Sequence, residues 1–295
     1  MKNITIIRLP HQGFCYGVRR SIQLLDEALL NKALPRPIYL LGNLVHNKNI
    51  QRYFKEKNII ILDGKSRLSM LDDIDRGTVV FTAHGVSPAV KKKAAQKELT
   101  VVDATCPYVE KTYSQIEKVL ASGYHLFYIG KKNHPETEAV FDLSTKVTLI
   151  AAEQSLPLIE SSTPIALAHQ TTMSHNDISS IYNFLLTKYN DIKLLDMICH
   201  ATQTRQDELT LAIKSIPFHK VALTLIIGDR SSNNSTKLME QAVHLNRSAV
   251  WFISGIADID FTAIRQFDYI IIASGTSTPI TIVTEIEQAL YRITD

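Results

Sequence analysis

Residues 100–113 read TVVDATCPYVEKTY, and this stretch decides the expected fold. A β-branched run up to Asp103 is typical of a strand, and the apolar spacing after Pro107 is typical of a helix. Cys106 lies between the two. A core cysteine would lie inside a strand, whereas the carboxyl end of a strand is where open α/β sheets present groups to ligands. The stretch therefore predicts an α/β sheet with a functional thiol at its edge.

All three cysteines of the chain lie in this setting. Each ends a strand-like apolar run and opens a run with helical spacing. The strand-like runs are ITIIRLPHQGFC at residues 4–15, LTVVDATC at residues 99–106 and IKLLDMIC at residues 192–199. Because the cysteines recur at one phase of a unit of roughly 90 residues, the sequence predicts three related α/β units.

Each unit contains three further strand-like runs. They lie at residues 37–47, 59–64 and 78–87, at residues 124–136, 146–152 and 164–174, and at residues 221–235, 249–255 and 269–279. Continuous apolar runs such as VALTLII suit strands buried on both faces, as in parallel sheets. A solenoid or one doubly wound sheet would also repeat, but neither requires one cysteine per unit. We expect three pseudo-threefold-related domains with mostly parallel sheets, at residues 1–105, 106–197 and 198–295.

The composition excludes several classes of protein. The 295 residues include 32 basic and 29 acidic side chains, a net charge of +3, so there is no basic excess to predict nucleic-acid binding. The only basic run, Lys91–Lys93, is interpreted as a solvated helix face. The start of the chain lacks a signal-peptide pattern, and no stretch approaches ~18 apolar residues, so we expect no membrane span. Three cysteines in such a chain indicate free thiols in a reducing cytoplasm.

Three thiols that converge on a threefold axis predict a metal site. Cys15, Cys106 and Cys199 each precede a helix, whose N-terminus favours the thiolate form that binds metals. Two metals fit three thiolates without a fourth cysteine: zinc with an added histidine, or an iron–sulfur cluster with one iron that lacks a protein ligand. Structural zinc sites usually use closely spaced pairs such as C-x₂-C, and the chain has none. The spacing alone leaves both metals open.

Polar side chains at the strand ends predict an anion site. Hydrogen-bond donors at helix starts are a natural seat for phosphate or diphosphate. The candidates are His46, Asn47, His84, His134, Thr171, Thr172, Ser232, Asn233, Asn234, Ser277 and Thr278. Glu136 is the carboxylate of the set, and a carboxyl group beside a metal in a closed pocket can deliver a proton. The alternative is that Glu136 stabilises the start of a helix.

Together these motifs resemble a known family. They are GFCYGV at residues 13–18, VHN at 45–47, AHGVS at 83–87, DATCP at 103–107, HPE at 134–136, QTT at 170–172, ICHAT at 198–202 with RQ at 205–206, and SGTSTP at 274–279. In this order they resemble the LytB family of 4-hydroxy-3-methylbut-2-enyl diphosphate reductases, iron–sulfur enzymes that end the non-mevalonate isoprenoid pathway. The resemblance covers nearly the whole chain, and the set is highly specific although VHN or QTT alone would mean nothing.

The resemblance implies a cloverleaf of three α/β domains around a central [4Fe–4S] cluster held by Cys15, Cys106 and Cys199. It implies that the substrate hydroxyl binds the fourth iron and that residues of the matching motifs bind the diphosphate. These residues are His46, His84, His134, Ser232, Asn234 and Ser277, with Asn233 in the same loop. Glu136 matches the carboxylate that delivers the proton, and Thr171 matches the threonine that orients the substrate hydroxyl. The resemblance also makes His134 an expected catalytic residue, together with Glu136 and Thr171.

The implied reaction is the two-electron reductive dehydroxylation of (E)-4-hydroxy-3-methylbut-2-enyl diphosphate. The hydroxyl leaves as water, and the allylic diphosphate becomes isopentenyl diphosphate or dimethylallyl diphosphate. The electrons arrive singly from an external carrier such as a ferredoxin or a flavodoxin. No nucleic-acid or membrane partner is expected.

The chain departs from the family pattern at three places. Asn233 stands where the family's Asn-Ser-Ser-Asn run has a serine, and Ala139 takes a usual glycine position. Gln12 and Tyr16 flank Cys15 where arginine and alanine are frequent. None of these changes removes a cysteine or Glu136, so the implied chemistry stands, with altered substrate handling as an open question.

Two other hypotheses come from different classes. One is a zinc-stabilised protein that binds a phosphorylated ligand without catalysis. The other is a cofactor-free cysteine enzyme, such as a racemase, that uses two thiols as acid and base. Neither needs three cysteines in phase together with Glu136, so the sequence favours the reductase.

Overall fold

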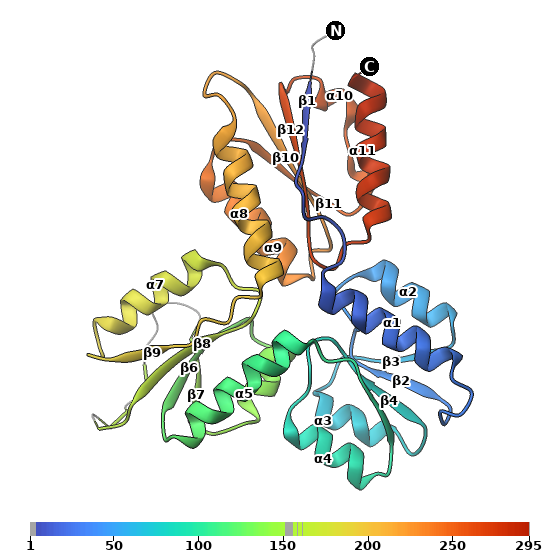
Figure 1. The fold of residues 1–295 in the computed structure, drawn as a ribbon, viewed down its shortest axis with the longest axis vertical. Coiled ribbons are helices and arrows are strands. Elements are labelled where there is room, and N and C mark those ends of the chain that lie inside the picture. Colours follow the sequence, from blue (N-terminus) through green and yellow to red (C-terminus); the bar gives the residue numbers. More distant parts are fainter. Residues whose placement is uncertain (1–3, 151–155, 158, 161, 295) are drawn as a thin grey trace. The chain divides into compact units, whose positions relative to one another are not determined.

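The structure is a computed structural model that describes residues 4–150, 156, 157, 159, 160 and 162–294. In these residues the chain forms three sheets of four parallel strands each, with helices on both faces (Figure 1). The expectation of repeated α/β units with parallel sheets is confirmed. Ala151 and Ala152, which the expected strand at 146–152 includes, lie outside the described residues.

The first sheet has the strand order β3-β2-β4-β5. Its strands are β2 (Ile38–Leu41), β3 (Ile60–Leu62), β4 (Thr78–Phe81) and β5 (Thr100–Asp103), and its helices are α1 (Tyr16–Leu30), α2 (Lys48–Glu56), α3 (Arg67–Met70) and α4 (Pro88–Gln96), with a 3₁₀ turn at Leu71–Asp73. Alternate residues of the strands point to opposite faces. Leu40 and Val80 pack under α1 and α2, whereas Val79 and Phe81 pack under α3 and α4.

The second sheet has the equivalent order β7-β6-β8-β9. Its strands are β6 (His125–Ile129), β7 (Val147–Ile150), β8 (Ile165–His169) and β9 (Ile192–Leu194), and its helices are α5 (Pro107–Ala121), α6 (Pro135–Phe141) and α7 (His175–Leu186). Tyr128 and Ala168 lie under α5 and α6, and Phe127 and Leu167 lie under α7. All five residues of β8 are buried, as expected for a strand covered on both faces.

The third sheet has the order β11-β10-β12-β1. Its strands are β10 (Ala222–Ile227), β11 (Ala249–Ile253), β12 (Tyr269–Ser274) and β1 (Thr5–Arg8), and its helices are α8 (His200–Ser215), α9 (Asn233–Leu245), α10 (Phe261–Ile264) and α11 (Ile280–Thr294), with a 3₁₀ turn at Ile256–Asp258. Ile226 and Ile271 pack under α8 and α9, whereas Leu225 and Ile270 pack under α10 and α11.

The N-terminal strand corrects one expected domain boundary. We expected residues 1–105 to form one domain, but β1 pairs with β12, with Thr5 opposite Tyr269 and Arg8 opposite Ile272. The physical reason is the repeat itself, because the strand before each cysteine completes the preceding sheet. Strand β5 pairs with β4, β9 pairs with β8, and β1 pairs with the last strand of the chain.

By their contacts, the three sheets fall into two compact units. One unit consists of the N-terminal segment up to Tyr16, of His46–Lys48 and of the chain from His200 onward, and it contains the third sheet. The other consists of Gly17–Val45 and Asn49–Cys199, and it contains the first and second sheets. Within the described residues, no helix has the length and apolar character needed to cross a membrane.

Candidate functional site

Each cysteine lies immediately before a helix. Cys15 precedes α1, Cys106 is the N-cap residue of α5, and Cys199 precedes α8. None of the three cysteines forms a disulfide, and all three are half-buried. The N-terminus of a helix carries a partial positive charge that attracts an anionic ligand such as a thiolate. The local positions expected from the sequence are therefore the observed ones.

One backbone hydrogen bond recurs at all three cysteines. The N–H groups of Cys15, Cys106 and Cys199 donate to the carbonyls of Thr276 at 3.1 Å, Ala83 at 3.0 Å and Thr171 at 2.9 Å. Each acceptor lies two residues beyond the end of a strand, namely β12, β4 and β8. The same backbone contact thus holds each thiol at the carboxyl end of its sheet, where α/β proteins place their sites.

Gly17 makes room for the thiol of Cys106. A Cβ atom on Gly17 would lie 2.5 Å from the Cys106 Sγ and 3.2 Å from its Cβ, so only glycine fits. The first turn of α1 therefore packs directly against Cys106. Cys15 is two residues before Gly17, which limits the distance between the Cα atoms of these two residues to about 7.6 Å. The space beside Gly17 and three cysteines outside any disulfide suit a soft metal centre such as zinc or iron with sulfide.

Glu136 is a buried carboxyl group in the first turn of α6. It is 2% exposed, and both of its oxygens accept hydrogen bonds from Thr171. The backbone N–H of Thr171 donates to Oε2 at 3.0 Å, and its hydroxyl donates to Oε1 at 3.1 Å. Burial raises the pKa of Glu136 to about 7, against the lowering effect of the two Thr171 bonds. A carboxyl group that titrates near neutral pH is suited to hold and release a proton.

Thr171 connects Glu136 to a cysteine loop. Its N–H donates to Glu136, while its carbonyl accepts the N–H of Cys199. The carboxyl group and the thiol-bearing loop thus lie on the two sides of a single residue. Glu136 is therefore linked to the Cys199 loop through one residue.

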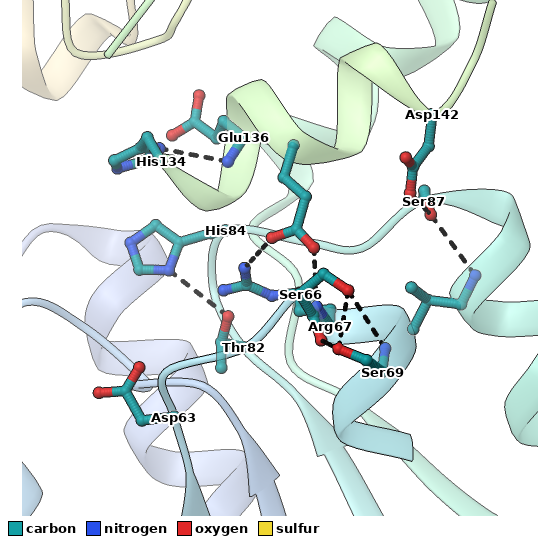
Figure 2. Close-up of polar contacts among 12 residues, drawn as sticks. Asp63, Ser66, Arg67, Ser69, Thr82, His84, Ser87, His134, Glu136 and Asp142 are labelled. Atoms are coloured by element: carbon teal, nitrogen blue, oxygen red, sulfur yellow. Dashed lines mark hydrogen bonds and ion pairs between the residues drawn. The ribbon is translucent and has the colours of Figure 1, made fainter. Parts of the chain in front are cut away.

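Two histidines lie beside Glu136 in the same unit. His134 is the N-cap of α6, and its Nδ1 accepts the N–H of Glu136 at 3.2 Å (Figure 2). A neutral His134 therefore carries its proton on Nε2. The rings of His84 and His134 are perpendicular, with centroids 5.3 Å apart. The hydroxyl of Tyr113 donates to the His84 carbonyl at 2.7 Å, which fixes this loop.

The start of α9 forms a second polar site, in the other unit. Ser232 is the N-cap residue, and the hydroxyl of Ser277 donates to the Ser232 Oγ at 3.3 Å and to the His46 carbonyl at 3.2 Å. The Asn234 Oδ1 accepts the N–H of Thr276 at 2.9 Å. The N-terminus of a 13-residue helix with two serine hydroxyls is suited to an anion.

Comparison with known proteins assigns the family. The sequence model of the LytB protein family matches residues 6–291. The 4-hydroxy-3-methylbut-2-enyl diphosphate reductase of Bacillus mycoides (strain KBAB4) is 40% identical over 283 residues, which are 95% of this chain and 88% of that protein. That of Bacillus licheniformis is 37% identical over 285 residues, 96% of this chain and 89% of that protein. The chain belongs to the LytB family.

Two solved structures agree with the fold of this LytB protein. The E-1-hydroxy-2-methyl-but-2-enyl-4-diphosphate reductase of Plasmodium falciparum has a TM-score of 0.86 at 25% identity, over 98% of this chain and 88% of that chain. A structure of (E)-4-hydroxy-3-methyl-but-2-enyl diphosphate reductase, the terminal enzyme of the non-mevalonate pathway, has a TM-score of 0.68 at 24% identity, over 98% and 99% of the two chains. The second likeness supports the fold alone.

The expected site residues are divided between the two compact units. One unit contains His84, Cys106, His134, Glu136, Thr171 and Cys199, and the other contains Cys15, His46, Ser232, Asn233, Asn234 and Ser277. Sequence reasoning missed Gly17, Tyr113 and Thr276 as supporting residues. Gly17 and Thr276 lie in quoted motifs, GFCYGV and SGTSTP, but their roles depend on a packing contact and a long-range bond. Nothing in the local sequence marks Tyr113.

Proposed function

We propose that this LytB-family protein is a 4-hydroxy-3-methylbut-2-enyl diphosphate reductase. It converts (E)-4-hydroxy-3-methylbut-2-enyl diphosphate, with two electrons and two protons, to isopentenyl diphosphate or dimethylallyl diphosphate and one water. The observation that carries the proposal is the buried Glu136, with a pKa of about 7, bonded to the residue that binds the Cys199 loop. Relatives that match over 95% of the chain and bear this enzyme name support it.

The proposed cofactor is one [4Fe–4S] cluster per chain, held by Cys15, Cys106 and Cys199. Three thiols in the same backbone setting, and a glycine that leaves space for one of them, fit such a group. The three cysteines would hold the cluster, which would supply the electrons one at a time. A reducing compartment such as the cytoplasm keeps these thiols free to bind it.

The side chains of the protein supply the proton chemistry. Glu136 delivers a proton to the substrate, because a pKa of about 7 lets this carboxyl group both hold and release a proton near neutral pH. The hydroxyl of Thr171, bonded to Glu136 at 3.1 Å, orients the substrate hydroxyl and relays the proton. The buried position of Glu136 and Thr171 keeps bulk water away from the transfer.

The diphosphate is bound by imidazole, hydroxyl and amide donors. Two of the donors are the Nε2–H of His134 and the imidazole of His84. The others are Ser232, Asn233 and Asn234 at the start of α9, together with Ser277 and with His46, whose carbonyl accepts the Ser277 hydroxyl. The amide group of Asn234 has two hydrogens, one of which goes to Thr202 at 3.2 Å, and the second is the donor for the ligand.

The test is anaerobic loading of the full chain with iron and sulfide, followed by a product assay. We expect a brown protein with broad absorption at about 400 nm. It should form both isoprenoid diphosphates when a reduced ferredoxin or flavodoxin supplies electrons. A colourless protein with one bound zinc and no turnover would instead support the zinc-stabilised binding protein. Turnover without any bound metal would support the cysteine enzyme.

A further inference from the structure

Helix α6 carries Glu136 and a second carboxylate, Glu138, in its first turn. Glu138 bonds Arg67, which belongs to the layer formed by the first sheet and its helices. The backbone N–H of Arg67 donates to the Glu138 Oε1 at 2.7 Å, and the Arg67 Nη1 donates to Oε2 at 3.2 Å. Arg67 lies at the start of α3, which packs on the first sheet, whereas α6 packs on the second. Both layers belong to the same compact unit. Two bonds to one carboxylate fix direction as well as distance.

The site around Arg67 is built for a guanidinium group. Arg67 is 5% exposed, and the side chain of Glu138 is 25% exposed. Gly42, at the end of β2, has φ +87°, and a Cβ atom there would lie 3.1 Å from the Arg67 Nη2. Burial lowers the pKa of Arg67, and the charge of Glu138 opposes this effect. A buried charge of this kind requires its partner, so loss of either residue leaves the other uncompensated.

The far end of α6 has its own contact with the first layer. The hydroxyl of Ser87 donates to the Oδ2 of Asp142, the residue that caps the C-terminus of α6, at 2.8 Å (Figure 2). Ser87 is also the N-cap of α4, and it follows His84 by three residues in the same loop. Arg67 and Ser87, which both belong to the layer of the first sheet, therefore hold α6 at its two ends.

The geometry of a helix separates the functional carboxylate from the anchoring one. Residues two positions apart do not face each other on a helix, and they point to nearly opposite sides. Glu136 accordingly bonds Thr171 of the second layer, while Glu138 bonds Arg67 of the first. A small rotation of α6 would move both carboxylates at once, so fixing Glu138 fixes Glu136.

We propose that Arg67 and Glu138 are positioning residues that hold Glu136 and His134 opposite His84. The Ser87–Asp142 bond supports them at the other end of the helix. The inference rests on the proposed function for its activity readout, but the arrangement itself is testable without turnover. Displacement of a reacting group by about 1 Å costs on the order of 10²-fold in rate, which sets the scale of the expected effect.

The decisive variants are Arg67→Met, Arg67→Lys and the double variant Arg67→Met/Glu138→Leu. The matched control is Lys65→Met, because Lys65 lies two residues away and forms an exposed ion pair with Asp73 at 2.9 Å. In Arg67→Met we expect kcat to fall by about 10- to 100-fold with KM changed less, and Arg67→Lys to recover part of the loss. The Lys65→Met enzyme should stay within about twofold of the parent.

The double variant separates positioning from stability. Two apolar side chains remove the uncompensated charge, so we expect the melting temperature to recover while kcat stays low, because no directed bond holds α6. Recovery of both stability and kcat in the double variant would overturn the proposal. So would an Arg67→Met enzyme that keeps the kcat of the parent.

Amide hydrogen exchange gives a readout that needs no substrate. The Thr171 N–H is bonded to Glu136, so its exchange should become roughly tenfold faster in Arg67→Met. The amides of the third sheet, in the other compact unit, should keep their protection. A uniform loss of protection across the chain would mean a purely structural role. If the parent forms no product while Thr171 behaves as expected, the proposed function fails and the positioning role stands.

Discussion

The starts of helices α6 and α9 use the same backbone arrangement with one decisive difference. In each, the second helical residue accepts the N–H of the residue that lies two positions past the end of a strand. Glu136 accepts the N–H of Thr171 at 3.0 Å, and Asn234 accepts the N–H of Thr276 at 2.9 Å. A carboxyl group thus stands in one unit where an amide stands in the other. Only the carboxyl group can exchange a proton.

The next residue of each helix lies against a strand-end glycine. A Cβ atom on Gly130 would lie 2.6 Å from the Thr137 Oγ1, and one on Gly228 would lie 2.4 Å from the Ser235 Oγ. Close approach of helix to strand is therefore a shared requirement of the repeat, and glycine meets it. The backbone contacts at the starts of α6 and α9 are therefore repeated, whereas the proton-carrying group is present only at α6. Substitutions of the repeated residues and of Glu136 should have different effects.

The largest loss of activity is expected for the cysteines, whose backbone contacts are the same beside α6 and beside α9. The N–H groups of Cys15 and Cys199 make the same contact, so Cys15→Ser and Cys199→Ser should behave identically. Because oxygen is a poorer ligand than thiolate for this soft site, each variant should lose most of its bound iron and all reductase activity. The iron content per chain and the rate of product formation are measured for both variants and for Cys106→Ser. Full iron content in any one of them would break the three-cysteine model.

The second-largest loss of activity is expected at Glu136, where the start of α6 differs from the start of α9. Glu136→Gln converts the α6 site into the amide type seen at α9. Turnover should fall by roughly 10²-fold or more, the usual scale of general acid–base catalysis, because an amide delivers no proton. Cluster content and substrate binding should persist, which single-turnover assays and iron analysis check. Near-normal turnover would mean that Glu136 only stabilises the start of α6.

The same variant predicts a change in the pH dependence of stability. Burial raises the pKa of Glu136 from 4.5 to about 7 in the folded chain, so the folded state holds this proton more tightly than the unfolded state. The stabilising contribution is complete below pH ~4.5 and is lost as the pH rises through about 7. Between these pH values the parent should lose about 3 kcal/mol of unfolding free energy relative to Glu136→Gln, at 1.36 kcal/mol per pKa unit. Denaturant titrations of both proteins across this range measure the difference, and parallel curves would contradict it.

The smallest effect is expected at the departure from the family pattern. Asn233 is the first residue of α9 and still carries an amide donor, so Asn233→Ser should change substrate affinity by less than about tenfold, or ~1.4 kcal/mol. Asn234→Ala should cost more, because it removes a buried donor from a charged ligand. Titrations of cluster-loaded protein compare the two. A gain well above tenfold for Asn233→Ser, with no change for Asn234→Ala, would show that the register of this loop is different.

Local sequence patterns determined the repeated unit and the identity of its candidate site residues. A strand, a cysteine and a helix follow one another at Cys15, Cys106 and Cys199 because strand and helix periodicity acts over a few residues. Pro107 adds a helix-start signal at one of the three. The polar residues at the strand ends were visible for the same reason, since a parallel sheet places all its carboxyl ends at one edge. Glu136 was recognisable as the carboxylate among them.

Tertiary structure alone decided the contacts that make these residues functional. Strand β1 completes the C-terminal sheet through pairs more than 250 residues apart, such as Thr5 with Tyr269, and no local pattern encodes that choice. The pKa of Glu136 depends on complete burial and on Thr171, 35 residues away. The bond between Arg67 and Glu138 joins two sheet layers. Burial and long-range hydrogen bonds exist only once the chain is packed, because they depend on distances in space and not along the chain.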